Sequence, residues 1–199
     1  FLGDNGGLAT SQEWREGPLY TQNSPLKCGK GSMYEGGIRV PFMVKWNGVV
    51  KPDTRNNTSI MIEDLFPTLL HMAQVNNYKV PQIVDGKDMV PLLEGKNEAE
   101  FNKRSIIWNF PNIWGNTGPG INLNCAIRQG DWKLIYNYET GEKELYNIPQ
   151  DIGENNNLAH ANPSKVKELS SILGKKLRQM NAQRPVVKAT SKPCAWPDE

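Results

Sequence analysis

The sequence lacks long hydrophobic runs and has little net charge. No apolar run approaches the roughly 18 residues needed to cross a bilayer, so we expect no membrane partner. The 199 residues carry 23 Lys and Arg against 21 Asp and Glu, which gives a net charge of +2. Proteins that bind nucleic acid need a basic surface to contact phosphates, and this balance argues against that class of partner.

Cysteine and histidine, which often carry catalysis or bind metals, are also scarce. Cys28, Cys125 and Cys194 form neither a CxxC pair nor a zinc-binding spacing, and their odd number leaves at least one thiol unpaired. The two histidines are His71, in a predicted helix, and His160, in a predicted loop. Neither supports a Ser–His or Cys–His catalytic pair, so the chemistry has to be sought elsewhere.

The first residues are typical of the interior of a domain. Phe1 and Leu2 have the character of a buried strand end, and they run directly into the turn-forming sequence Gly3-Asp4-Asn5-Gly6-Gly7. No initiator Met, signal peptide or polar leader precedes them. We therefore expect the chain to be the C-terminal portion of a longer protein.

The first hundred residues predict a long loop, a strand and a short helix. Residues 8–37 show little apolar periodicity and read as an irregular segment, which in a compact domain is often functional. The apolar run from Ile38 to Trp46 predicts a strand, and Asp64 is a good N-cap for a helix. The apolar face of that helix, which we expect to lie in the core, consists of Phe66, Leu69, Leu70 and Ala73.

The polar residues 94–104 predict a boundary near residue 100, which divides the chain into parts 1–100 and 101–199. The second part predicts an antiparallel meander, because short apolar runs alternate closely with turns. Its expected strands are Ser105–Phe110, Asn124–Arg128, Trp132–Tyr136 and Lys143–Asn147. Asn162-Pro163 begins a helix that ends at about residue 182 and should pack on one face of the sheet. The tail after Arg184 is expected to be extended or disordered.

Two segments carry groups that suit a ligand. Asp4 and Asn5 place carboxylate and amide oxygens side by side, and such donors favour Ca²⁺ or Mg²⁺, although the same residues are common in ordinary turns. Lys30 is flanked by Gly29 and Gly31, so its ammonium group is suited to contact an anion, or it is a solvated loop lysine. The phosphate-binding frame GxxxxGK[ST] is absent, which disfavours nucleotide binding.

Three motifs, taken in order, resemble the sulfatase family: GDNGG at 3–7, GKGSMYEGGIRVP at 29–41 and DLFPTLL at 64–70. Shorter similarities continue the match almost to residue 182. They are DG at 85–86, PLL at 91–93, GDWKL at 130–134, ELYN at 144–147 and NLA at 157–159.

The resemblance implies the end of an alkaline-phosphatase-like α/β domain followed by a small antiparallel sheet with a packed C-terminal helix. Such an enzyme hydrolyses sulfate esters with a formylglycine nucleophile and a bound Ca²⁺. By this resemblance Asp4 and Asn5 are metal ligands, Lys30 is catalytic and contacts the sulfate, and Glu35 and Arg39 are structural. A divalent cation and an ammonium group both stabilise the negative charge of the transition state. The expected substrate is a sulfated small molecule or saccharide, and the expected compartment is periplasmic, secreted or lysosomal.

The chain departs from the family pattern in one important respect. The CxPxR or SxPxR element that yields formylglycine does not occur after Cys28, Cys125 or Cys194, nor elsewhere in the sequence. We therefore expect the chain alone to be inactive, and the N-terminal half of the same protein to supply the formylglycine and the remaining Ca²⁺ ligands. Two alternatives stay open: a phosphate or phosphonate ester hydrolase of the same superfamily, or a non-catalytic module that binds sulfated glycans through the aromatic segment 108–114.

Overall fold

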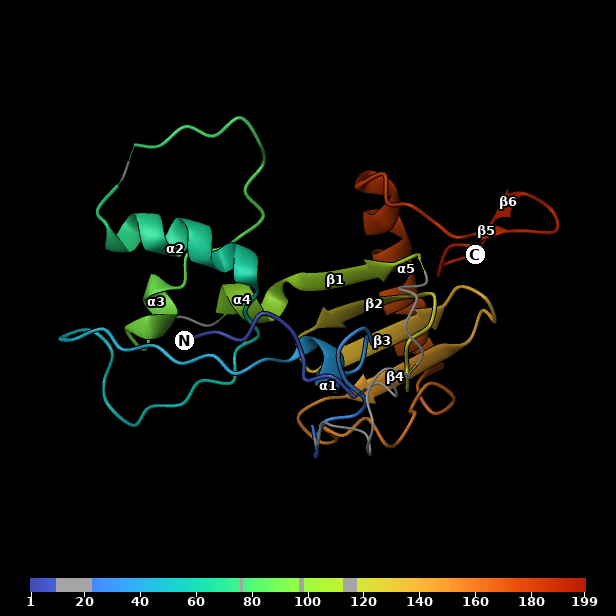
Figure 1. Cartoon of the computed structure of the whole chain (residues 1–199), viewed down its shortest axis with the longest axis horizontal. Coiled ribbons are helices and arrows are strands. Elements are labelled where there is room, and N and C mark those ends of the chain that lie inside the picture. Colours follow the sequence, from blue (N-terminus) through green and yellow to red (C-terminus); the bar gives the residue numbers. More distant parts are fainter. Residues whose placement is uncertain (10–22, 76, 97–98, 113–117) are drawn as a thin grey trace. The chain divides into compact units, whose positions relative to one another are not determined.

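The structure is a computed structural model that describes residues 1–9, 23–75, 77–96, 99–112 and 118–199 (Figure 1). The chain forms two compact units. Unit 1 comprises residues 1–42 and 105–199, and unit 2 comprises residues 43–104. Residues 1–42 thus group with the C-terminal sheet, whereas the expected division placed them with residues 43–100; as a division of the intact protein, that expectation stays a prediction. Within the described ranges, no helix has the length and apolar character to span a membrane.

Unit 1 is built around a four-stranded antiparallel meander in the order β1-β2-β3-β4. The strands are β1 (Ser105–Phe110), β2 (Asn124–Gln129), β3 (Trp132–Asn137) and β4 (Lys143–Asn147). Gly130, with φ of +57°, turns the chain between β2 and β3, a conformation that favours glycine. The predicted strands and their antiparallel order are confirmed, as is a mixed α/β fold class.

One face of this sheet packs on helix α5 (Pro163–Gln179), as the sequence predicts. Because side chains alternate along a strand, every second residue of β2, β3 and β4 points toward the helix. The residues that meet in this core are Cys125, Ile127, Leu134, Tyr136, Leu145, Leu169, Leu173 and Leu177. Figure 1 shows α5 crossing behind the sheet.

The C-terminal tail is ordered and extended rather than disordered. It forms a small hairpin of β5 (Val186–Val187) and β6 (Lys192–Pro193) and then packs Trp196 against the α5 core. The Arg184 guanidinium lies over the Trp196 ring at 4.3 Å, and its Nη1 donates to the carbonyl of Cys194 at 2.7 Å. These contacts fix the tail against the domain.

The opposite face of the sheet is covered by the segment that leads into helix α1 (Glu35–Ile38). Met33 and Tyr34 pack there on residues of β2, β3 and β4, namely Ala126, Ile135 and Tyr146. Both faces of the meander are therefore buried, which the sequence did not predict.

A buried cluster of charges fastens α1 to this face. Lys133 of β3 has no exposed surface, and its Nζ lies 3.1 Å from Glu35 Oε1 and 2.8 Å from Glu154 Oε1. Arg128 Nη1 approaches Glu35 Oε2 at 3.5 Å. Burial alone raises the pKa of Glu35, but Lys133, Arg128 and Arg39 outweigh burial and hold this pKa below its usual value. For Glu154 burial outweighs the attraction of Lys133, and its pKa is raised.

Unit 2 consists of short helices around a small core. They are η1 (Ile62–Asp64), α2 (Leu65–Met72), α3 (Val90–Leu93) and α4 (Ala99–Lys103). The buried Asp64 carboxylate makes no capping bond to α2. It accepts instead from both Arg104 Nη atoms, at 2.7 and 2.6 Å, and from the backbone N–H of Met61 and Lys87. Asp64 thus occupies the predicted N-cap position of α2, but its side chain does not cap the helix, because a buried carboxylate is stabilised more by a bidentate arginine than by a helix end.

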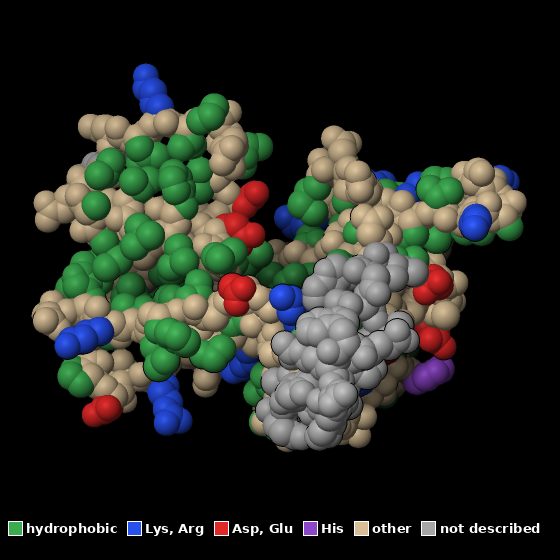
Figure 2. Space-filling view, in the orientation of Figure 1, with side chains coloured by type: hydrophobic (Ala, Val, Ile, Leu, Met, Phe, Trp, Pro, Cys, Tyr) green, Lys and Arg blue, Asp and Glu red, His purple; other side chains and the backbone are tan. Residues whose placement is uncertain are grey.

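The expectation that the apolar face of α2 lies in the core is also wrong for this chain. Phe66 and Leu69 are 44% and 58% exposed, while Thr68 is buried and bonds to the Asp64 carbonyl and the Met89 N–H. Among the described residues of unit 2, the buried apolar side chains are Met89, Val90, Leu92 and Phe101, which are too few to cover a whole helix face. Figure 2 shows apolar side chains at the surface over α2.

The strand predicted over Ile38–Trp46 does not form. Phe42 makes a single antiparallel bridge to Leu2, and the N–H of Gly3 donates to the carbonyl of Pro41 at 3.0 Å. A strand needs a neighbour for its backbone groups, and in the described part of the chain this segment pairs with no more than these residues.

The charge cluster gives the first testable expectation. Lys133→Met should lower the free energy of unfolding by about 3–5 kcal/mol, because two buried carboxylates lose their shared partner. Urea unfolding followed by circular dichroism measures the change. Lys175→Met, at an exposed position of α5, is the control and should stay within about 0.5 kcal/mol of the wild type. Equal effects of the two substitutions would contradict a special role for the cluster.

Candidate functional site

The structure brings the loop that carries Asp4 and Asn5 against the loop that carries Lys30. The backbone N–H of Lys30 donates to the carbonyl of Gly7 at 2.9 Å. On the other side, the N–H of Gly6 donates to the carbonyl of Gly37 at 3.1 Å. The two predicted ligand segments are thus neighbours in space, 23 to 26 positions apart in sequence.

This contact depends on four glycines, Gly6, Gly29, Gly36 and Gly37, which we call the glycine junction. A Cβ on Gly6 would lie 2.0 Å from the Gly36 carbonyl oxygen, and a Cβ on Gly36 would lie 2.4 Å from that of Cys28. A Cβ on Gly29 would lie 2.4 Å from the Gly7 carbonyl oxygen, and a Cβ on Gly37 would lie 2.2 Å from that of Ser32. Any side chain at these positions would force the segments apart.

The side chain of Asn23 also holds the Lys30 loop in place. Asn23 Nδ2 donates to the carbonyls of Gly7 and Cys28 at 3.0 and 2.9 Å, which ties both loops to one side chain.

Cys28 has φ of +60°, an uncommon conformation for a residue other than glycine. Burial is the main cause of a raised pKa for its thiol, so Cys28 does not have the properties of an activated nucleophile.

The predicted metal ligands present a fitting but partial donor set. Asp4 is exposed and Asn5 is half-buried, and both offer oxygen atoms, which hard cations such as Ca²⁺ prefer. Ca²⁺ takes about six to eight oxygens, so these two residues supply only a fraction of a complete site. Across the described ranges, no group of three or more His, Cys, Asp or Glu side chains is placed to hold a metal ion.

Sequence reasoning missed a polar cluster beside the glycine junction. Glu144 accepts hydrogen bonds from the hydroxyls of Tyr34, at 2.9 and 2.8 Å, and of Tyr146. Lys27 Nζ lies 4.1 Å from the centre of the Tyr34 ring and donates to the Glu154 carbonyl at 3.1 Å. Burial, followed by Glu144, raises the pKa of Tyr34, and the same two causes raise that of Tyr146, so both hydroxyls stay protonated donors. The alternation in ELYN places Glu144 and Tyr146 on one face, but nothing in the sequence identifies the partner Tyr34.

The two histidines take no part in this arrangement. His71 Nδ1 contacts Asp88 Oδ2 at 2.6 Å within unit 2. His160 lines a cavity of about 820 Å³ beside α5 in unit 1.

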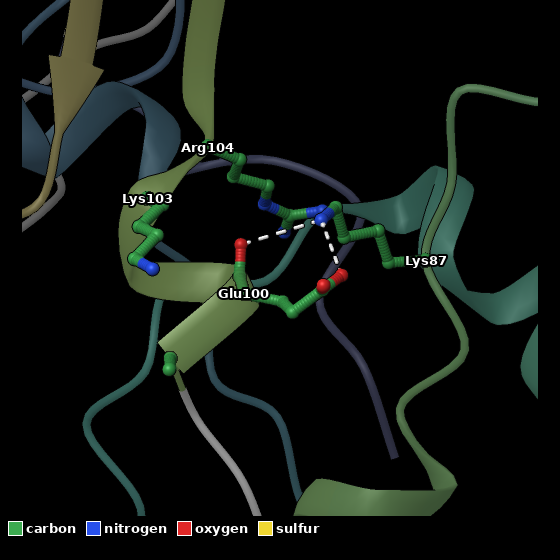
Figure 3. A pocket seen from close by; sticks show the side chains of 5 residues that line it. Lys87, Glu100, Lys103 and Arg104 are labelled. Atoms are coloured by element: carbon green, nitrogen blue, oxygen red, sulfur yellow. Dashed lines mark hydrogen bonds and ion pairs between the residues drawn. The ribbon is translucent and has the colours of Figure 1, made fainter.

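A smaller cavity of about 380 Å³ lies in unit 2 beside α4 (Figure 3). The Lys87 ammonium points across it to the carboxylate and carbonyl of Glu100, both at 3.3 Å. Arg104, at its edge, is committed to Asp64. Lys87 and Arg104, which line this cavity, are thus each paired with a carboxylate, and we assign no function to the cavity.

Comparison with known proteins places this arrangement in a family. The family model for N-sulphoglucosamine sulphohydrolase, C-terminal, matches residues 28–183. The chain belongs to the sulfatase family. The matched model describes the C-terminal portion of such proteins, as the motifs predict.

Individual sulfatases support the same assignment. A sulfatase from Formosa agariphila is 35% identical over 187 residues, which cover 89% of this chain and 32% of the relative. The solved structure of Ps i-CgsB in complex with k-i-k-neocarrahexaose has a TM-score of 0.67 and 26% identity over 93% of this chain and 37% of its own. That of BT4656 in complex with its substrate D-glucosamine-2-N,6-O-disulfate has a TM-score of 0.61 and 27% identity, over 75% and 30%. The chain thus spans about a third of the length of these sulfatases.

The glycine junction gives the second expectation. Gly6→Ala should lower the free energy of unfolding by about 3 kcal/mol, because the new methyl group meets backbone rather than a movable side chain. Gly141→Ala is the matched control: a Cβ there meets nothing within 4 Å, and only its φ of +73° is unfavourable, at about 1 kcal/mol. Chemical denaturation of both variants measures the difference, and a Gly6→Ala effect no larger than that of Gly141→Ala would contradict the close packing.

Proposed function

We propose that this chain forms the C-terminal part of a sulfate-ester hydrolase and contributes three residues to its active site. Asp4 and Asn5 bind Ca²⁺, and Lys30 contacts the sulfate group. The observation that supports this proposal best is the glycine junction, because it holds the two loops together by backbone contacts that tolerate no side chain. The proposed roles come from the resemblance of these positions to sulfatase motifs, and the matched family model includes Lys30 but not Asp4 or Asn5.

The proposed roles follow from the charge that develops during the reaction. Cleavage of a sulfate ester spreads negative charge over the sulfuryl oxygens and the leaving oxygen. The Lys30 ammonium stabilises that charge from a loop anchored at Gly7, so little reorganisation is needed as the charge develops. A bound Ca²⁺ supplies a second positive charge to the sulfate oxygens, and Asp4 and Asn5 would hold it.

The nucleophile is not among the 199 residues. No cysteine or serine here lies in a CxPxR or SxPxR element, so the formylglycine would come from another part of the intact protein. On this proposal the chain alone does not turn over sulfate esters, and the intact protein does. We propose a sulfated saccharide as the substrate class, because the related BT4656 is solved with a disulfated glucosamine as its substrate.

The proposed role of Lys30 is tested in the intact protein. Lys30→Met should lower kcat/KM for 4-nitrophenyl sulfate about a hundredfold, since it removes one donor of transition-state charge stabilisation. Lys51→Met, at an exposed position, is the control and should leave kcat/KM unchanged. Retention of activity within threefold in Lys30→Met would overturn the role of this residue. Faster turnover of 4-nitrophenyl phosphate than of the sulfate by the wild type would favour the phosphatase alternative instead.

The metal role is tested by calorimetric titration of the intact protein with Ca²⁺. Asp4→Asn removes a carboxylate charge and should weaken binding at least about tenfold, which corresponds to about 1.4 kcal/mol. Asp53→Asn, in an exposed turn, is the matched control and should bind Ca²⁺ as the wild type does. Identical Kd values for all three proteins would contradict the assignment of Asp4 as a ligand.

A further inference from the structure

Glu154 is a buried carboxylate with contacts on two sides. It follows β4, adopts φ of +50° and has no exposed surface. Its Oε2 accepts a hydrogen bond from the backbone N–H of Glu35 at 2.7 Å, and its Oε1 lies 2.8 Å from Lys133 Nζ. A non-glycine residue in this backbone conformation is strained, and such strain persists where the surroundings over-determine it.

The hydrogen bond that Glu154 accepts comes from the start of α1, and α1 carries two glycines of the glycine junction. Glu35 is the first residue of α1, and Gly36 and Gly37 follow it directly. The N–H of Gly36 donates to the Lys27 carbonyl at 2.9 Å, and the carbonyl of Gly37 accepts from Gly6 at 3.1 Å. The position of α1 therefore sets the surface on which the loop with Asp4 and Asn5 rests.

Glu154 acts on the second loop as well. Its backbone carbonyl accepts from Lys27 Nζ at 3.1 Å, and Lys27 stands three residues before Lys30. Glu154 thus contacts the Lys30 loop directly, and it reaches the Asp4–Asn5 loop only through Glu35 and the neighbouring Gly37. Apolar packing would hold the same segments to the sheet without fixing their direction, whereas a hydrogen bond defines it.

We propose that Glu154 is a positioning residue, which sets the placement of the Asp4–Asn5 loop and the Lys30 loop through the N–H of Glu35. The inference rests on the proposed function for its catalytic consequence, but its structural part does not. The hydrogen bond, rather than the charge, carries the effect. Glu154→Gln retains an acceptor of the same length, and Glu154→Ala does not.

The structural part is tested by amide hydrogen exchange in the 199-residue chain, followed by NMR. In Glu154→Ala the amides of Gly6 and Lys30 should exchange at least tenfold faster relative to the hydrogen-bonded amides of β2 and β3, and in Glu154→Gln they should stay within threefold of the wild type. Leu173→Ala, which opens a cavity in the α5 core on the other face of the sheet, is the control for general destabilisation. It should not single out Gly6 and Lys30.

Two results would overturn the proposal. One is a selective loss at Gly6 and Lys30 in Leu173→Ala as large as in Glu154→Ala, and the other is an equal loss in Glu154→Gln. Should Glu154→Ala fail to fold, Glu154→Asp replaces it, because it keeps the charge but is one methylene too short to reach the N–H of Glu35. It should expose the same two amides.

The catalytic part is tested in the intact protein with 4-nitrophenyl sulfate. Glu154→Ala should lower kcat/KM about tenfold and Glu154→Gln by less than threefold, at a temperature where both are fully folded. If the exchange result holds while Lys30→Met retains activity, the positioning stands and the proposed function fails. If Lys30→Met loses activity while both Glu154 variants keep it, the positioning role fails and the proposed function stands.

Discussion

The fold of unit 1 depends on one buried lysine. Lys133 lies between Glu35, 98 positions earlier in the chain, and Glu154, with no access to solvent. Removing three charges from water is costly, and the cost is offset only when the partners meet at close range with their remaining polar atoms bonded. The cluster therefore accepts few arrangements of α1 on the sheet, and it gives the N-terminal segment a defined position that apolar contacts alone would not.

A second constraint, steric rather than electrostatic, extends this order to the proposed active-site loops. At the glycine junction carbonyl oxygens occupy the space that side chains would need, so the three segments approach one another at backbone distance. The ion cluster holds α1 on the sheet, the hydrogen bond from the Glu35 N–H to Glu154 sets its placement, and the glycine junction passes that placement on to the two loops. Asp4 and Lys30, neither of which is deeply buried, thus lie on loops that backbone contacts hold together.

Residue patterns over short stretches of the sequence predicted the strands of the sheet and helix α5. The four strands and α5 follow from alternation, turns and a proline at the helix start, and the family motifs identified the family. Lys133 escaped prediction because Trp132-Lys133-Leu134 is typical of a strand with one solvated face, and no periodicity shows that a distant segment covers it. For Phe66 and Leu69 the apolar spacing was read correctly as helical, but burial depends on what surrounds the helix, which the spacing does not contain.

In the proposed site, the placement of Asp4, Asn5 and Lys30 matters more than the affinity of these residues alone for Ca²⁺ or sulfate. Two oxygen-bearing residues are too few to bind Ca²⁺ strongly, and one lysine has no nucleophile to assist. On the proposed function, their contribution is that they are already held in place for the remaining ligands and the substrate, since a group ordered in advance loses no further entropy on binding. On the proposed function, a buried cluster away from the substrate would still influence the reaction, because a shift of about 1 Å in the loops it positions would be a shift of about 1 Å at the sulfate.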